Sequence, residues 1–128
     1  IVFNDSVMRG KLEEIIHPEV MRVIDEEIRS IKSNSSDAVV ILDVPLLIEV
    51  GMHKGMSEVI VVYCPEDMQI MRLMFRDNIS REEALTQVRA QMPIEEKRRL
   101  ATLLIDNSAS VDETRKQVED AYDRLVRH

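Results

Sequence analysis

The chain has 128 residues, of which 45% are hydrophobic and 32% are charged, and this composition is typical of one soluble globular domain rather than of a disordered chain. Its formal net charge of -7 argues against nucleic-acid or anionic-lipid binding over the whole molecule. A single cysteine excludes an internal disulfide framework, and no apolar run approaches the roughly 20 residues that span a bilayer. We therefore expect a cytoplasmic protein that binds neither nucleic acid nor membranes.

Two helices are predicted at the start of the chain. Apolar residues recur at helical spacing over 7–16, where the pair His17 and Pro18 interrupts them. Pro18 suits the first position of a second helix, which we expect to run to about Lys32. The polar sequence SNSSD over 33–37 then predicts a linker with turn chemistry.

Three segments are predicted to be strands: 38–42, 58–64 and, more weakly, 102–106. The first two, AVVIL and EVIVVYC, are apolar runs without alternation, which is typical of strands buried on both faces of a parallel sheet. The connections between them are long enough for crossovers. The chain is therefore predicted to be an α/β domain with a mostly parallel sheet.

Further helices are indicated by proline and by capping residues. Residues 66–77 follow a proline, and a Ser-x-x-Glu capping box precedes each of two later apolar stripes. The predicted helix starts and the residues that mark them are Pro65 before 66–77, Ser80 with Glu83 before a helix to about Gln91, Pro93 before a short helix, and Ser110 with Glu113 before the last helix.

Polar residues at the predicted strand ends are candidate site residues, because ligands bind at the carboxyl ends of parallel strands. Asp43 ends the first strand and Pro45 turns the chain out of the sheet, so Asp43 could face a metal or a phosphate-bound substrate. The alternative is a carboxylate bonded to loop amides. Asn107 could read a base edge or form an Asx turn. His17 could contact a ligand or cap a helix.

Arginines are concentrated in the middle of the chain. Arg72 and Arg76 are spaced to share one helical face, with Arg81 and Arg89 beyond them, and such a face suits phosphate binding. Nearby acidic residues could instead pair with these arginines on a solvated surface. The basic run 97–99 is expected to face water. The 128 residues contain no metal-ligand cluster, no Ser-His-Asp series and no glycine-rich phosphate loop.

Several motifs in order resemble the dephospho-coenzyme A kinase family over nearly the whole chain. The motifs are LEEIIHPEV, ILDVPLLIEVG, VIVVYCPEDMQIMRLMFRDNISREEAL, RAQM, EEKRRLA and IDNSAS. The most specific is DVPLL-x-E after a buried strand, followed by the interleaved Gln-x-x-x-Leu and Arg-x-x-x-Arg patterns that begin at Gln69 and Arg72.

The resemblance implies a three-layer P-loop NTP hydrolase/kinase-like fold with a parallel sheet. It implies transfer of the γ-phosphoryl of ATP, with Mg²⁺, to the ribose 3′-hydroxyl of dephospho-CoA. It also implies a single partial kinase domain over 1–128: a helical substrate-side region over about 1–37, a core over about 38–65 and 102–128, and a lid over about 66–101. By position, the implied roles are catalysis for Asp43, substrate binding for His17, Pro45, Leu46 and Glu49, and ATP binding for Arg72, Arg76, Asn107 and Arg89. No residue is expected to be a dedicated metal ligand.

Two departures from the family pattern stand out. The family reads Ala-Asp before its last strand, where this chain has Ala101 and Thr102. The family's first part, with its glycine-rich loop, is not among these residues, so we expect an N-terminally truncated kinase that is inactive alone. The family's P-loop strand lies between the strands matched by 38–42 and 58–64, so either self-association through exposed sheet edges or a rearranged sheet is expected. The alternatives are another nucleoside or nucleotide kinase, or a non-catalytic binding or assembly module.

Overall fold

The computed structural model describes the backbone of residues 6–127 and the side chains of residues 18–127. The chain divides into two compact units, Ile1–Asp43 and Val44–His128. Within residues 6–127, no helix combines the length and the apolar character needed to cross a membrane.

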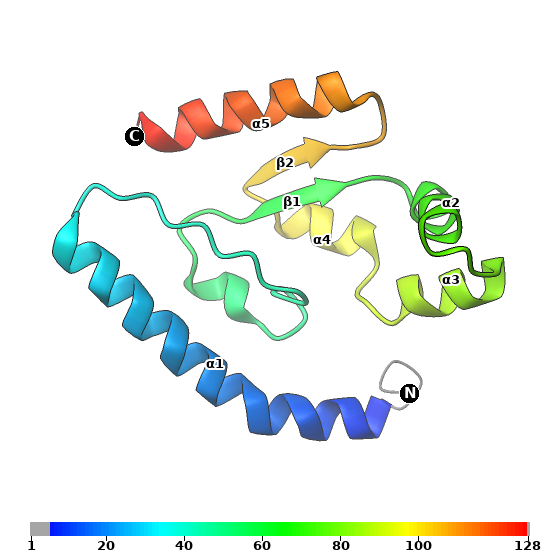
Figure 1. The fold of residues 1–128 in the computed structure, drawn as a ribbon, viewed down its shortest axis with the longest axis horizontal. Helices are drawn as coiled ribbons and strands as arrows, with labels where there is room; N and C mark the ends of the chain where they lie inside the picture. The colour runs from blue at the N-terminus through cyan, green and yellow to red at the C-terminus, as the bar shows by residue number, and fades with distance from the viewer. Residues whose placement is uncertain (1–5, 128) are drawn as a thin grey trace. The chain divides into compact units, whose positions relative to one another are not determined.

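The first unit contains one continuous helix, α1 (Ser6–Asn34), with Pro18 in its interior. The prediction of two helices separated at Pro18 is therefore wrong. Proline removes only one of the hydrogen bonds of a 29-residue helix, and the other bonds keep both halves in a single element. The ribbon of α1 bends along its length (Figure 1), as helices with an internal proline commonly do.

Residues 38–42, which were predicted to form a strand, have no assigned secondary structure. A strand exists only with a hydrogen-bonded neighbour, and within residues 6–127 no segment pairs with this one. Both Val39 and Ile41 are exposed, as expected for an apolar run without a partner. The strand prediction is wrong here because the pattern indicates burial but cannot supply a pairing partner.

The second unit is built on two parallel strands, β1 (Ile60–Tyr63) and β2 (Leu103–Asp106). Ile60 is opposite Leu103 and Tyr63 is opposite Asp106, and the strands lie side by side in Figure 1. The strands expected within 58–64 and 102–106 are confirmed, with narrower limits. The prediction of an α/β fold with a parallel sheet is also confirmed.

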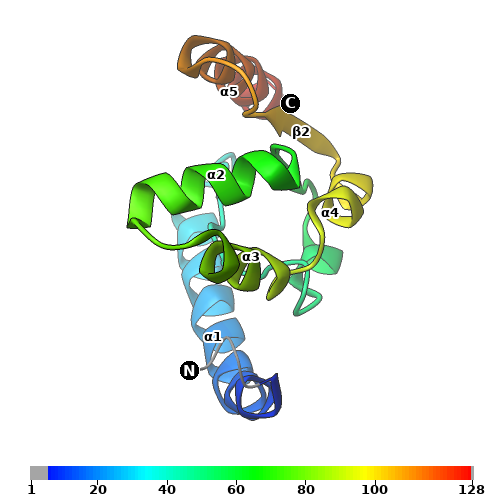
Figure 2. The ribbon, with the colours of Figure 1, turned by 90° about the vertical axis from the view of Figure 1, so that its right-hand side faces the viewer.

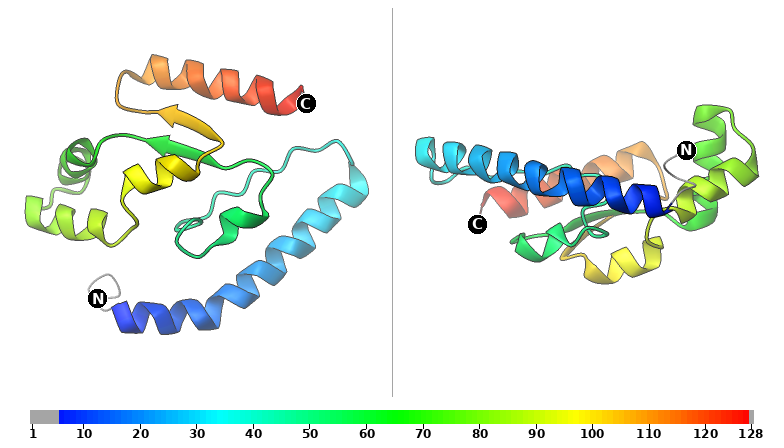
Figure 3. Two further views of the ribbon diagram at one scale, coloured as in Figure 1. Left: turned by 180° about the vertical axis from the view of Figure 1, so that it is seen from behind. Right: turned by 90° about the horizontal axis from the view of Figure 1, so that it is seen from below.

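The two faces of this sheet are covered differently. Side chains alternate along a strand, so Val61 and Leu104 share one face, where they pack with Ile48 and Ile94 in the hydrophobic core. The helix that contributes Ile94 lies on one side of the sheet in Figure 1 and in the reverse view of Figure 3. On the other face Ile105 is buried, whereas Ile60 and Val62 of β1 are exposed.

Four of the remaining helices begin where the capping residues and prolines predict: α2 (Glu66–Asp77), α3 (Arg81–Arg89), α4 (Ile94–Leu100) and α5 (Val111–Val126). A short 3₁₀ helix, η1 (Met52–Gly55), was not predicted. The Ser80 and Ser110 hydroxyls accept hydrogen bonds from the amides of Glu83 and Glu113, at 3.1 Å and 3.2 Å. Each bond satisfies one otherwise free donor in the first turn of the helix. Both predicted helix starts are confirmed.

Helices α2 and α3 pack against each other with their axes crossing, and Figure 2 shows α2 lengthwise and α3 nearly end-on. Asn78, with φ 53, ends α2 in the left-handed conformation that asparagine tolerates better than most residues. Ala84 of α3 and Ile70 of α2 are the most deeply buried side chains of the hairpin. We call the two helices together the α2–α3 hairpin.

Thr102 directly precedes β2 and bonds to the residues that precede β1. Its hydroxyl donates to the Glu58 carboxylate and accepts from the Val59 amide at 2.8 Å. Glu58 also pairs with Arg124 of α5 at 3.6 Å. The departure from the family's Ala-Asp pattern is thus accommodated, because the hydroxyl takes the amide hydrogen bond and Glu58 supplies a carboxylate.

Replacement of Ile70 by alanine is expected to lower the free energy of unfolding by about 2–5 kcal/mol, because this side chain is 1% exposed and would leave a cavity. Urea denaturation of the wild-type and variant chains measures the change. Phe75→Ala on the same helix is the control, since Phe75 is 93% exposed and its loss should change the free energy by less than about 0.5 kcal/mol. Equal effects of the two substitutions would contradict the packing of α2 described above.

Candidate functional site

Helix α2 is tied to the carboxyl ends of both strands. The Gln69 side chain donates to the Cys64 carbonyl at 2.9 Å, and the Arg72 guanidinium donates to the Asn107 carbonyl at 2.7 Å. The Asn107 amide in turn donates to the Tyr63 carbonyl at 2.7 Å, which extends the pairing of the strands by one bond. Together with Thr114, we call Cys64, Gln69, Arg72 and Asn107 the strand-end cluster.

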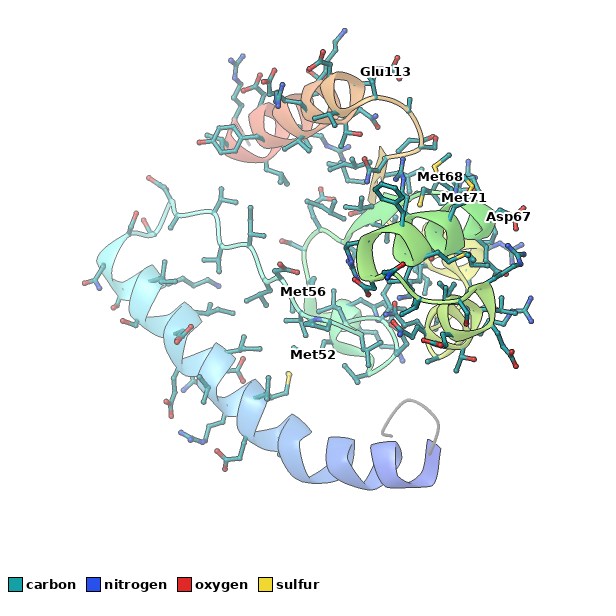
Figure 4. The ribbon with its side chains drawn as sticks, turned by 45° about the vertical axis from the view of Figure 1, so that its right-hand side comes forward. Met52, Met56, Asp67, Met68, Met71 and Glu113 are labelled. Carbon is teal, nitrogen blue, oxygen red and sulfur yellow. The ribbon has the colours of Figure 1, made fainter. Side chains whose placement is uncertain are left out.

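The Asn107 side chain is oriented by α5. The Thr114 hydroxyl donates to Asn107 Oδ1 at 2.8 Å, and no hydrogen-bond acceptor within residues 18–127 is recorded for Asn107 Nδ2. Both amide protons are therefore available to an acceptor such as a ring nitrogen or a carbonyl oxygen. Figure 4 shows the two helices that supply the cluster, with Met68 and Met71 labelled on α2 and Glu113 on α5.

Gln117 of α5 fixes the last residue of β2. Its side-chain oxygen accepts from the Asp106 amide at 2.8 Å, and its side-chain nitrogen donates to the Asp106 carbonyl at 2.8 Å. This pair of bonds replaces the two that a neighbouring strand would make. The Asp106 carboxylate accepts from the Ser108 hydroxyl and amide, and these bonds lower the pKa of Asp106.

The other two candidate arginines lie outside the strand-end cluster. Arg76 pairs with Asp77 at 2.9 Å, and this hydrogen bond lowers the pKa of the Asp77 carboxyl. Arg89 pairs with Glu66 at 3.5 Å, across the α2–α3 hairpin. Exposed pairs of this kind contribute little stability, so a bound phosphate could replace either carboxylate at small cost. The structure thus brings Arg72 and Asn107 together and leaves Arg76 and Arg89 in separate surface pairs.

Asp43 and Pro45, from the DVPLL motif, are both exposed. Asp43 ends the first unit, and its carboxylate has no recorded hydrogen-bond or ion-pair partner within residues 18–127. His17 lies within α1, but its side chain is outside the described residues.

The DVPLL motif contains a strained turn. Leu46 has φ 60, and a proline followed by a residue of positive φ is the pattern of a type II turn. Leucine in this conformation costs of order 1–3 kcal/mol, whereas glycine would adopt it freely. The Leu46 carbonyl accepts from the Val50 amide at 3.0 Å, so the turn continues directly into the next one.

Glu49 forms a part-buried ion pair with Lys97. Its Oε2 atom lies 2.8 Å from Lys97 Nζ and accepts from the Met92 amide at 3.1 Å. Burial raises the pKa of Glu49, but the hydrogen bonds from Lys97 and from backbone amides outweigh it and lower the pKa overall. The expectation that the run 97–99 faces water is wrong for Lys97, because an acidic residue far away in the sequence provides its partner.

Tyr63 joins β1 to α4 through contacts that the sequence did not indicate. Its hydroxyl donates to Glu95 Oε1 at 2.7 Å, which raises the pKa of Tyr63, and the Arg98 guanidinium lies 4.8 Å from the ring centroid. The geometry is that of a cation–π contact. The residues are too far apart in the sequence for any local pattern to pair them.

A dedicated metal centre is not formed by the residues that the structure describes. Among them, no three histidine, cysteine, aspartate or glutamate side chains are placed to hold one ion. This arrangement is compatible with Mg²⁺ carried by a nucleotide, because Mg²⁺ keeps several waters and binds through substrate phosphates with only one or two carboxylates. Asp43, which is exposed and unpaired within the described part of the chain, is a carboxylate of that kind.

Comparisons with known proteins agree on one family. A family model described as dephospho-CoA kinase matches residues 1–113. A dephospho-CoA kinase of Carboxydothermus hydrogenoformans is 47% identical over 118 residues, which are 92% of this chain and 57% of the relative. A dephospho-CoA kinase of Sulfurimonas denitrificans is 35% identical over 125 residues, covering 98% of this chain and 61% of the relative.

Solved structures give the same result. A crystal structure of a protein from Thermus thermophilus matches with a TM-score of 0.74 and 35% identity, over 97% of this chain and 63% of that one. A dephospho-CoA kinase from Campylobacter jejuni matches with a TM-score of 0.67 and 28% identity, over 98% and 62%. The chain spans about three fifths of the length of the curated relatives it matches. The matches extend over nearly all of its own length, so the chain belongs to the dephospho-CoA kinase family.

Proposed function

We propose that this chain supplies the lid and part of the core of a cytoplasmic dephospho-CoA kinase, which moves the γ-phosphoryl of ATP to the ribose 3′-hydroxyl of dephospho-CoA. The observation that carries the proposal is the strand-end cluster, in which a lid helix of the family's motif meets the Asn107 loop. The bond that breaks joins the γ-phosphorus to its bridging oxygen, and the bond that forms joins it to the 3′-oxygen, whose proton passes to a base.

The residues of this chain contribute positioning and positive charge, which dominate catalysis of phosphoryl transfer. Asn107 Nδ2 donates to the adenine, and Arg72 holds the Asn107 loop. Arg76 and Arg89 exchange their exposed carboxylate partners for phosphate oxygens. We propose that Asp43 faces the Mg²⁺ of the nucleotide, which offsets phosphate charge when bound.

Three of the four substrate-side roles implied by the family resemblance remain part of the proposal, whereas the fourth residue, Glu49, is paired with Lys97. His17, Pro45 and Leu46 are the residues that we propose contact dephospho-CoA. The strained conformation of Leu46 supports a site at this turn, because strained backbone is concentrated at binding sites.

The 128-residue polypeptide by itself is expected not to turn over. It has three glycines and no glycine-rich loop, so nothing in it clamps the β- and γ-phosphates. A coupled assay of ADP release, with and without dephospho-CoA, measures this. Turnover by the 128 residues alone that depends on dephospho-CoA would contradict the expectation.

A chimera tests the activity itself. The part of the Carboxydothermus relative that precedes its match to this chain is joined ahead of Ile1, where the family resemblance places the glycine-rich loop. The chimera should release ADP only when dephospho-CoA is present. Asp43→Asn in the chimera should lower kcat by about 100-fold, because a charged group next to the phosphates is lost. A folded chimera without dephospho-CoA-dependent ADP release would sink the proposed function.

Thr114→Val in the same chimera is expected to raise the KM for ATP about fivefold with little change in kcat, because one hydrogen bond that orients Asn107 is worth about 1 kcal/mol. Thr86→Val is the matched control, since the Thr86 hydroxyl only donates to the Glu82 carbonyl on the exposed side of α3. Steady-state kinetics at varied ATP distinguish the two. An unchanged KM for ATP in the Thr114 variant would contradict the claim that Thr114 orients Asn107 for ATP binding.

Self-association of the chain is the further proposal about partners. Within residues 6–127, β1 pairs only with β2, so one edge of β1 is open, and its Ile60 and Val62 side chains are exposed on one face of the sheet. Sedimentation velocity should show dimers or larger species whose proportion rises with concentration. Val62→Lys should reduce them, whereas Val111→Lys, at an exposed position of α5, should not. A monomer at all concentrations would contradict this proposal.

A further inference from the structure

The segment between α3 and α4, residues 90–93, is held by the Glu49–Lys97 ion pair. We call this segment the α3–α4 corner. Glu49 Oε2 accepts from the Met92 amide within the corner, and it lies 2.8 Å from Nζ of Lys97, a residue of α4. Lys97 Nζ also donates to Gln91 Oε1 at 3.3 Å. Two residues of the corner are therefore bonded to the two members of one ion pair.

This ion pair is much less exposed than a typical surface pair. The Lys97 and Glu49 side chains are 15% and 18% exposed, compared with 63% and 90% for Arg115 and Asp112 on α5. The second carboxylate oxygen, Glu49 Oε1, is buried and has no hydrogen-bond partner among the residues that the structure describes. The Glu49 charge therefore depends on Lys97, on its own backbone amide and on the Met92 amide for its stabilisation.

The Glu49 side of the pair is a rigid support. Residues 46–52 form consecutive turns closed by amides of Val50, Gly51 and Met52, at 3.0 Å each. Ile48, in the same turns, is buried in the hydrophobic core with Val59 and Val61. The corner rests on that core as well, because Met92 and Ile94 pack against it.

The corner is the point at which the α2–α3 hairpin rejoins the rest of the second unit. Helix α3 ends at Arg89, directly before the corner, and packs along α2, which carries Arg72. A shift of the corner would move α3 and, through it, α2. We propose that Glu49 and Lys97 are positioning residues: their ion pair fixes the α3–α4 corner and so the place of α2, which carries Arg72 at the strand ends.

The proposal gives Glu49 a role that differs from direct contact with substrate. The claim that the pair fixes the corner rests on the geometry alone, and the claim that it affects catalysis rests also on the proposed kinase function. Two separate measurements, one structural and one kinetic, keep these claims apart.

Hydrogen exchange of the 128-residue chain tests the structural claim. Lys97→Met should speed exchange of the Met92 amide and of α3 by about tenfold, because the remaining carboxylate is left buried without a cation. Glu49→Gln should have a smaller effect, since the amide oxygen can still accept from Met92. Exchange in the double variant Glu49→Gln with Lys97→Met should be slower than in Lys97→Met alone, because the double variant has no unpaired buried charge. Arg115→Met, which breaks the exposed pair on α5, should leave α3 unchanged.

Acid unfolding provides a second structural readout. The lowered pKa of Glu49 means that its contribution to stability is present above the pKa of the unfolded chain and is lost as the pH falls through the lower, folded value. Lys97 is the charged group recorded as facing this carboxylate, while Gln91 and the Met92 amide are neutral. Glu49→Gln should therefore make unfolding less dependent on pH in that acidic range.

Kinetics of the chimera test the catalytic claim. Lys97→Met should raise the KM for ATP by about tenfold, because small displacements of positioned groups have large effects, and the KM for dephospho-CoA should change less. Lys97→Arg, which keeps the charge, should recover most of the loss.

If Glu49 instead binds substrate directly, Glu49→Gln would raise the KM for dephospho-CoA and leave exchange at Met92 unchanged, which would overturn the proposal. A folded chimera without activity would contradict the proposed kinase function. Hydrogen exchange would still decide whether the ion pair fixes the corner.

Discussion

The parallel pairing of β1 and β2 is the constraint on which the rest of the second unit depends. Because the strands run in the same direction and in register, Tyr63 and Asp106 are opposite each other, and the two chain segments that follow leave from one edge. Asn107 can then bond to Tyr63, and α2, which begins after β1, can reach the end of β2 with Arg72. An antiparallel pair would place these two ends on opposite edges.

The α2–α3 hairpin is attached to the sheet and core at two places. One is the strand-end cluster, where Gln69 and Arg72 bond to carbonyl oxygens, and the other is the α3–α4 corner. Between the attachments, Arg76 and Arg89 have only exposed carboxylate partners. Fixed ends and weakly paired arginines are what a phosphate-binding lid requires, since the helices must stay in place while individual side chains change partners.

Local signals in the sequence were sufficient to predict most of the second unit. Each of these signals involves only a few neighbouring residues, so it is visible in the sequence. They are the serine caps at 80 and 110, the prolines before α2 and α4 and the apolar runs of both strands. The prediction failed where a partner decides the structure. Residues 38–42 have the composition of a strand but no neighbour within the described residues, and Pro18 is tolerated because the helix around it is long.

The candidate site shows the same division between local and long-range information. Arg72 and Asn107 were recognisable from motif and strand-end position, but their mutual contact depends on the parallel pairing. The basic run 97–99 predicts that Lys97 faces water. Lys97 is instead paired with Glu49, which is 48 positions earlier in the sequence. No periodic pattern relates two such positions, so only the folded structure could pair them.

The turn within the DVPLL motif explains why the chain changes direction there. Pro45 ends any extended segment and Leu46 adopts a left-handed conformation, so the chain changes direction within two residues after Asp43. The strain at Leu46 is offset by the succeeding turns and by the burial of Ile48. The Asp43 carboxylate is exposed and has no recorded hydrogen-bond or ion-pair partner within the described residues. A carboxylate left without protein donors keeps its full capacity to interact with a hydrated cation, which is the interaction that the proposed role of Asp43 requires.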